Sequence, residues 1–245
     1  MLRTFIAAAI LTASAFALSD KELDSIGSRV WKNECGGTRE GLTSWNSGEA
    51  FASLGIGHFI WYPAGGSGPY EESFPGLVAF LSGSGVKLPS WLNADMPCPW
   101  RTKAEFEADA QSSKMKELRA LLAGSIREQS RFLARRMEKA LPKLLAAGGN
   151  KTAMEKRFKA LLATGSGTYA LIDYVNFKGE GTNPKERYKG VGWGLLQVLE
   201  GMDGDSSKAF GESAARVLTR RVENSDPTRN ERKWLAGWLN RVHGY

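Results

Sequence analysis

The sequence has 245 residues and a hydrophobic content of 42%, which suits one large domain or a two-lobed one and excludes a disordered chain. Its 33 Lys and Arg against 26 Asp and Glu give a formal net charge of +7. Positive charge favours adsorption to anionic envelope polymers. Clusters of Lys and Arg beside aromatic residues, which would indicate nucleic-acid binding, are not found, so we expect no nucleic-acid partner.

Residues 1–17 have the pattern of a secretory signal peptide. Arg3 precedes an apolar run through Leu11, and the triplet Ala15-Phe16-Ala17 predicts cleavage before Leu18. The alternative, an N-terminal membrane anchor, is disfavoured because the apolar run is shorter than a spanning helix requires. We therefore expect a periplasmic or secreted monomer with no integral membrane span after processing. Its formal charge is +6, since the removed segment carries one Arg and no acid.

Two cysteines, Cys35 and Cys98, permit one disulfide in an exported chain. We expect this disulfide to form, against the alternative of two free, buried thiols. The two cysteines and two histidines stand at no recognisable zinc-ligand spacing, so no metal and no cofactor is expected.

A helix is predicted to begin at Ser19 and to end at Gly36 and Gly37. Ser19 and Glu22 form a capping box, and an apolar stripe at helical spacing follows them. Glu34 then stands on the last turn, where the negative end of the helix dipole favours the protonated carboxyl that a general acid requires.

A short, twisted hairpin is predicted after this helix, with its turn at residues 46–48 (Asn-Ser-Gly). Glu49 and Ser53 fall on or beside its strands. The segment GIGHFIWY follows, in which Gly55 and Gly57 permit close backbone approach and the aromatic residues offer flat faces that suit sugar rings.

The rest of the chain is predicted to be mostly helical. We expect interruptions at Gly124-Ser125 and at Pro142, and a helix start at a capping box of Thr152 and Glu155. A buried helix should end at Gly179. The last helix should direct these residues inward: Trp234, Leu235, Trp238, Leu239 and Val242.

Three segments together resemble the phage-type lysozymes, a family within the lysozyme-like glycoside hydrolases. The first is Glu34 at a helix end, followed by a hairpin and by residues 53–58 (SLGIGH). The second is residues 170–181 (ALIDYVNFKGEG), similar to the family's central helix. The third is residues 227–229 (PTR) before a tryptophan-rich helix. The resemblance covers roughly residues 20–60 and 168–240.

The resemblance implies a mainly helical α+β fold of the lysozyme-like, two-lobed type. A catalytic domain at 18–245 would then hold a small β-hairpin lobe, about 18–100, and a larger helical lobe, about 101–245.

The resemblance also implies roles for individual residues. Glu34 corresponds to the catalytic acid, and Ser53 to a threonine that holds the attacking water. The family's aspartate corresponds to Ser47, so we choose Glu49 as the second carboxylate, with Glu40 and Glu180 behind it. The remaining assignments are an ion pair from Arg229 to the acid and substrate contacts from Gly57, His58, Phe59, Asn176 and Phe177, with His58 expected to make structural hydrogen bonds.

The function expected from this resemblance is hydrolysis of the peptidoglycan glycan backbone by general acid catalysis. Two alternatives stay open: a chitosanase-like hydrolase of a deacetylated amino-sugar polymer, and a non-catalytic wall-binding protein on a lysozyme scaffold. Clustered acids near the site would favour the chitosanase, because glucosamine is cationic. The exact glycan and the inverting or retaining outcome are not determined by the sequence.

Overall fold

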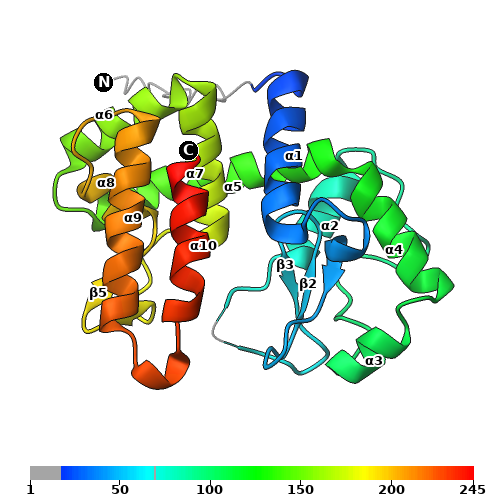
Figure 1. Ribbon diagram of the computed structural model, residues 1–245. Helices are drawn as coiled ribbons and strands as arrows, with labels where there is room; N and C mark the ends of the chain where they lie inside the picture. The colour runs from blue at the N-terminus through cyan, green and yellow to red at the C-terminus, as the bar shows by residue number, and fades with distance from the viewer. Residues whose placement is uncertain (1–17, 69) are drawn as a thin grey trace, which may run out of the picture.

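The computed structural model describes residues 18–68 and 70–245, so the expected signal peptide at 1–17 lies outside the described part. The described chain is mainly helical with two small antiparallel sheets, which confirms the α+β class. Figure 1 shows two groups of elements, one containing the three-stranded sheet and one built of helices. We call them the sheet side and the helical side.

The sheet side begins with helix α1 (Asp20–Cys35), which has the expected capping box at Ser19 and ends at Gly36 in the left-handed region at φ 63°. A 3₁₀ turn, η1 (Glu40–Leu42), leads into the strands β1 (Thr43–Ser44), β2 (Ala52–Leu54) and β3 (Phe59–Trp61). Their order is β1-β2-β3, with Ser44 opposite Ser53 and Leu54 opposite Phe59. The hairpin is therefore present, although its strands are shorter than the sequence pattern indicates.

Three helices complete this side: α2 (Phe74–Gly83), α3 (Lys103–Ala108) and α4 (Ser113–Gly124). The last two follow the lobe boundary expected near residue 100, yet they pack on the sheet side (Figure 1). Trp45 meets the ring of Phe106 on α3 with centroids 5.8 Å apart. Arg119 on α4 donates to the Thr43 hydroxyl at 2.8 Å.

Helix α5 (Ile126–Ala147) joins the two sides and crosses α1, against which it packs (Figure 1). The break before it at Gly124-Ser125 is confirmed. The break expected at Pro142 is wrong, because α5 continues through it. Pro142 removes one backbone donor, but Met137, Ala140 and Leu144 around it are fully buried, and this packing keeps the segment helical.

The helical side contains the remaining elements. They are α6 (Lys151–Leu162), α7 (Gly165–Lys178), β4 (Arg187–Tyr188), β5 (Val191–Gly192), α8 (Leu195–Glu200), α9 (Ser207–Asn224), η2 (Pro227–Arg229) and α10 (Arg232–His243). Helix α7 ends at Gly179 as predicted, whereas the capping residue of α6 is Asn150, two positions before the expected Thr152. Helices α9 and α10 form an antiparallel pair (Figure 1).

Helix α10 covers less apolar surface than its sequence suggests. Val242 is fully buried, but Trp234 is 46% exposed, so the expectation that all five apolar residues face inward is wrong. Trp234 stacks on Trp238 with ring centroids 6.1 Å apart. An amphipathic stripe indicates which face is apolar, and the neighbouring helix decides how much of that face is covered.

A fully buried glutamine connects the sheet to the start of α5. Gln129 accepts the Ile56 N–H at 2.9 Å through Oε1, and its Nε2 donates to the Leu122 carbonyl at 2.6 Å and to the Ser125 hydroxyl at 3.1 Å. It thereby fixes the Gly55–His58 turn against the α4 to α5 junction.

We predict that Gln129→Leu destabilises the protein by about 2 kcal/mol, because it leaves the buried Ile56 N–H without a partner and removes one of the two donors to the Leu122 carbonyl. Urea unfolding followed by circular dichroism measures this change. The control is Gln111→Leu at an exposed position, which should change the free energy of unfolding by less than about 0.5 kcal/mol. Equal effects from the two variants would contradict the assigned role of Gln129.

Candidate functional site

Glu34 lies on the last turn of α1 with a side chain that is 14% exposed. Its Oε1 accepts a hydrogen bond from Arg241 Nη2 at 2.6 Å. Its Oε2 lies 3.6 Å from Nδ1 of His58. The carboxylate is therefore held between α10 on the helical side and the glycine-rich turn on the sheet side.

Arg241 also holds a fully buried carboxylate, Asp173 on α7. Its Nε and Nη2 each donate to Asp173 at 2.8 Å, and the Tyr245 hydroxyl donates to the same carboxylate at 2.6 Å. Burial opposes the charge on Arg241, but the Asp173 hydrogen bonds outweigh it and raise the Arg241 pKa. A continuous chain of contacts thus runs from Tyr245 through Asp173 and Arg241 to Glu34.

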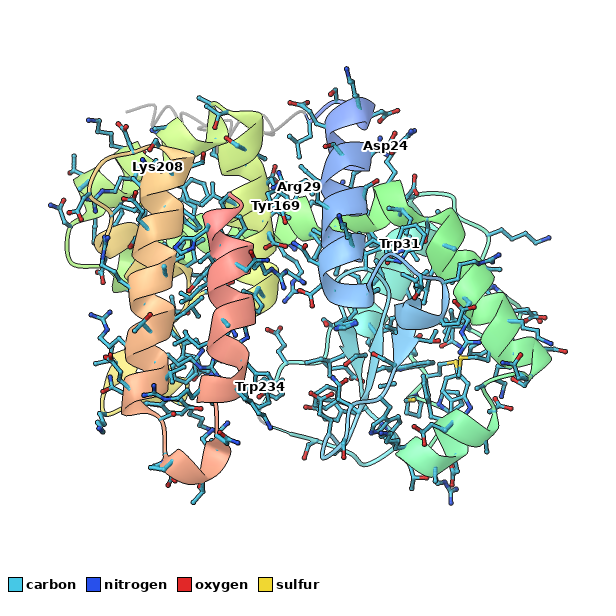
Figure 2. The ribbon with its side chains drawn as sticks, viewed as in Figure 1. Asp24, Arg29, Trp31, Tyr169, Lys208 and Trp234 are labelled. Atoms are coloured by element: carbon cyan, nitrogen blue, oxygen red, sulfur yellow. The ribbon has the colours of Figure 1, made fainter. Side chains whose placement is uncertain are left out.

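Helix α1 also contacts the helical side through residues that precede Glu34 on the helix. The guanidinium of Arg29 lies 3.4 Å from the ring centroid of Tyr169, and its Nη2 donates to the Gly244 carbonyl at 3.0 Å. Asn33 donates to the Tyr169 hydroxyl at 2.7 Å. Figure 2 shows Arg29 and Tyr169 together between α1 and the helices of the helical side. These contacts fix the end of α1, and with it Glu34.

The turn between β2 and β3 brings His58 to Glu34. Gly55 has φ 69°, and a Cβ there would lie 2.4 Å from Gln129 Oε1. His58 itself has φ 48°, in the left-handed region that residues other than glycine seldom adopt. Strained backbone of this kind is concentrated at functional sites. A Cβ on Gly57 would lie 3.0 Å from Asn176 Oδ1, so the turn also meets the end of α7.

Glu49 lies beside the strands, in the loop between β1 and β2, whereas Ser53 lies on β2 itself. Asn46 donates to its carboxylate at 3.0 Å, and Trp45 Nε1 donates to its backbone carbonyl at 2.8 Å. Burial raises the pKa of Glu49, and the charge of His58 acts on it in the opposite direction. Glu49 is therefore a partly buried carboxyl held by Asn46 in the loop before β2.

The other candidate acids and Ser53 have separate environments. Ser53 is only 3% exposed, on the central strand of the sheet. Glu40 is exposed in η1. Glu180 forms an ion pair with Lys143 at 2.9 Å.

The two aromatic residues expected to contact substrate, Phe59 and Phe177, differ in their environments. Phe59 is fully buried, and its ring packs on Phe132 with centroids 5.5 Å apart. It is a core residue, which corrects its assignment as a substrate contact. Phe177 is half-buried at the end of α7, where the Arg241 guanidinium lies 4.0 Å from its ring centroid.

Arg229 does not contact Glu34, which corrects the expected ion pair. Its Nε lies 3.3 Å from Glu231, while Glu34 is paired with Arg241. The chain turns at Pro227–Arg229 and α10 runs back along α9, so Arg241 lies roughly 13 Å further along the helix than its first residue. The PTR segment, residues 227–229, therefore lies at the turn, and Arg241, later in the sequence, contacts Glu34.

Glu231 stabilises the turn at which Arg229 lies. It is 2% exposed and receives Arg221 at 2.8 Å and 3.0 Å and the Tyr188 hydroxyl at 2.8 Å. Burial acts to raise the pKa of Glu231, but the hydrogen bonds from Arg221 and Tyr188 outweigh it and lower the pKa to about 2. Glu231 is thus ionised at neutral pH and serves a structural role.

The expected disulfide is wrong: Cys35 and Cys98 are free and buried. Cys35 Sγ lies 3.4 Å from the Gly55 carbonyl, at the turn end of the sheet. The Cys98 backbone N–H donates to the Tyr62 carbonyl at 2.9 Å, past the other end of β3. These ends are separated by roughly 10 Å of strand, which exceeds the Cα separation of about 7 Å that a disulfide tolerates. Burial raises the pKa of each thiol to about 12.

The other residues of this site were not identified from the sequence. Arg241, Tyr245 and Lys178 carry no motif. Asp173 did carry a signal, because it is the one acid inside the apolar helix of residues 170–175, and a carboxylate in such a position requires a buried partner.

Other features of the described chain lie outside this site. An open hollow of about 640 Å³ is lined by residues 86–90 and by α4, and it includes none of the expected site residues. Within residues 18–68 and 70–245, no group of three or more His, Cys, Asp and Glu is placed to hold a metal ion. No helix in this same part of the chain is long and apolar enough to cross a bilayer.

The comparisons with known proteins give no match: no family model fits the chain, and no curated protein and no solved structure is significantly similar to it. The interpretation of the site therefore depends on its geometry and chemistry.

We predict that the unfolded, unreduced protein contains two titratable thiols, and that the folded protein reacts slowly with a thiol reagent. At pH values near 8, a thiol with a pKa of about 12 is ionised on the order of once in ten thousand molecules. The measurement is thiol titration with and without denaturant. If no free thiol is found after denaturation, the two cysteines are joined in a disulfide, as expected from the sequence.

Proposed function

We propose that this chain is an exported, lysozyme-like glycoside hydrolase that cleaves the peptidoglycan glycan backbone, with Glu34 as its general acid. The observation that carries the proposal is the position of Glu34. One of its oxygens is fixed by Arg241, and the other faces His58 on a strained, glycine-rich turn. The two-lobed arrangement of the lysozyme-like fold belongs to the same proposal.

The sequence resemblance and the packing support each other. The three resembling segments are far apart in the sequence, yet the end of α1, the Gly55–His58 turn and the end of α7 meet at one place. The arginine that the family pairs with its acid has a counterpart here in Arg241, which comes from the tryptophan-rich helix although not from the PTR segment.

In the proposed reaction, protonated Glu34 gives its proton to the glycosidic oxygen as the bond from that oxygen to the anomeric carbon breaks. Water adds to the anomeric carbon, and its proton passes to a second carboxylate, for which we propose Glu49. Arg241 and Asp173 would hold Glu34 in a single orientation. A base with a raised pKa, as burial gives Glu49, accepts the proton of water more readily than an ordinary carboxylate.

The charges near Glu34 favour peptidoglycan over a glucosamine polymer. The Lys178 Nζ and the Arg241 guanidinium lie 3.9 Å and 4.0 Å from the ring centroid of Phe177, next to the acid. Arg241 is already paired with Glu34 and Asp173, and Lys178 carries its charge below a pKa of about 6, so repulsion of a polycationic glycan is expected at acidic pH. An activity assay on cell walls distinguishes the proposed hydrolase from the alternative, a non-catalytic wall-binding protein.

We predict that Glu34→Gln lowers the clearing of purified cell walls by at least about a hundredfold, because the amide keeps the shape but has no proton to transfer. Turbidity and mass analysis of released fragments measure the loss. The control is Glu40→Gln at an exposed position, which should retain activity. Walls cleared at near wild-type rate by Glu34→Gln would refute the proposed acid, and no clearing by the wild type would favour the wall-binding protein.

We predict that Glu49→Ala lowers turnover on the order of a hundredfold while binding of glycan is largely kept, since it removes the group that accepts the proton of water. Ser53→Ala should have a smaller effect. Glu180→Ala serves as the matched comparison, because that acid is paired with Lys143. If Glu180→Ala is inactive and Glu49→Ala is not, the second carboxylate comes from the loop after α7.

A further inference from the structure

Cations and aromatic rings alternate along the helical side next to Glu34. The Arg241 guanidinium and the Lys178 Nζ lie 4.0 Å and 3.9 Å from the ring centroid of Phe177. Lys178 Nζ also lies 3.5 Å from the ring centroid of Trp238, and the Arg221 guanidinium lies 5.1 Å from it. We call these five residues the cation-aromatic row.

The three cations of this row differ in their partners. Arg241 pairs with Glu34 and Asp173, and Arg221 pairs with Glu231. The Lys178 side chain has no ion pair and no hydrogen bond to any residue within 18–68 and 70–245, whereas the two arginines of the row each have carboxylate partners. The carboxylates near the row are therefore already used by arginines.

The half-buried amine of Lys178 lacks the carboxylate partner that would stabilise its charged form. Burial, together with the charges of Arg221 and Arg241, lowers the pKa of Lys178 to about 6. The two ring faces offset part of this cost through cation-π attraction. A carboxylate brought by a ligand would supply the missing ion pair and occupy the free donors.

We propose that Lys178 is the binding site for a carboxylate carried by the glycan substrate, and that it selects an acidic saccharide over a neutral one of the same length. This inference rests on the proposed function, since it places the carboxylate beside Glu34. The carboxylate could come from a lactyl ether on the sugar or from a peptide attached to it. The shared chemistry is an anionic group on the saccharide next to the bond to be cleaved.

Binding of a carboxylate at Lys178 is coupled to uptake of a proton. Below the Lys178 pKa of about 6 the ammonium is already present, and binding is strongest. As the pH rises above that value, the free protein loses the charge that the complex needs, so affinity falls. The charged groups that act on Lys178 are Glu34 on α1, Arg221 on α9, Glu231 just before α10, and Arg241 within it.

The test measures binding by calorimetry to the Glu49→Ala protein, in which turnover is expected to be slow and the pairing of Glu34 with Arg241 beside Lys178 is kept. Three tetrasaccharides serve as probes: a neutral N-acetylglucosamine tetramer, an alternating N-acetylglucosamine and N-acetylmuramic acid tetramer with free lactyl carboxylates, and the latter with short acidic peptides in amide linkage. We expect at least one carboxylated probe to bind more tightly than the neutral one. Its affinity should fall on the order of tenfold from about pH 5.5 to about pH 7.5.

Adding Lys178→Met should weaken the carboxylated probe about tenfold at the lower pH, remove most of the pH dependence, and leave the neutral tetramer within about twofold. Lys185→Met, an equal change of charge at an exposed position on the following loop, should leave all affinities unchanged. Lys178→Arg should restore the preference for the carboxylate. The probe that responds identifies the source of the carboxylate.

Proton uptake gives a second measurement that does not depend on the folding of the Lys178→Met variant. Near pH 7.5, the calorimetric enthalpy in buffers of different ionisation enthalpy should show uptake of nearly one proton with the carboxylated probe and none with the neutral one. Equal affinity for all three probes without proton uptake would overturn this inference alone. Failure of all three to bind would overturn the proposed function together with it.

Discussion

The double ion pair of Arg241 with Asp173 and Glu34 is the interaction on which the candidate site depends. It joins α10, α7 and α1 through one guanidinium, 2.6 Å from Glu34 and 2.8 Å from Asp173. Removing either partner of a buried pair leaves a charge without compensation, which costs about 3 to 5 kcal/mol. The arrangement of three helices is thus specified by a contact that would be costly to break, whatever its net contribution to stability.

The glycine-rich turn is positioned by a second polar contact of the same kind. Gln129 reaches from α5 to the Ile56 N–H, and Gly55 leaves room for its amide where any Cβ would collide. The turn is then tight enough to hold His58 at φ 48° beside Glu34. Two buried polar networks, and not the apolar core alone, therefore bring the two sides of the molecule to one point.

Local signals predicted much of the chain because they act within a few residues. The capping box at Ser19, the stop at Gly36, the turn at residues 46–48 and the end of the central helix at Gly179 all follow from short-range geometry. Pro142 and Trp234 were misjudged because packing between elements overrides local preference. Phe59 was misplaced for the same reason, since its burial depends on packing against Phe132 of α5, which is distant in the sequence.

The sequence by itself determined the helical class, the position of Glu34 on the last turn of α1, and the glycines of the turn that follows. Tertiary structure alone decided the partners: Arg241 and not Arg229 for Glu34, free thiols in place of a disulfide, and two aromatic rings for Lys178. The physical reason is distance along the chain. Caps and turns are closed within one helical turn, whereas Glu34 and its arginine are separated by 207 residues, and only the packing of α1, α7 and α10 brings them together.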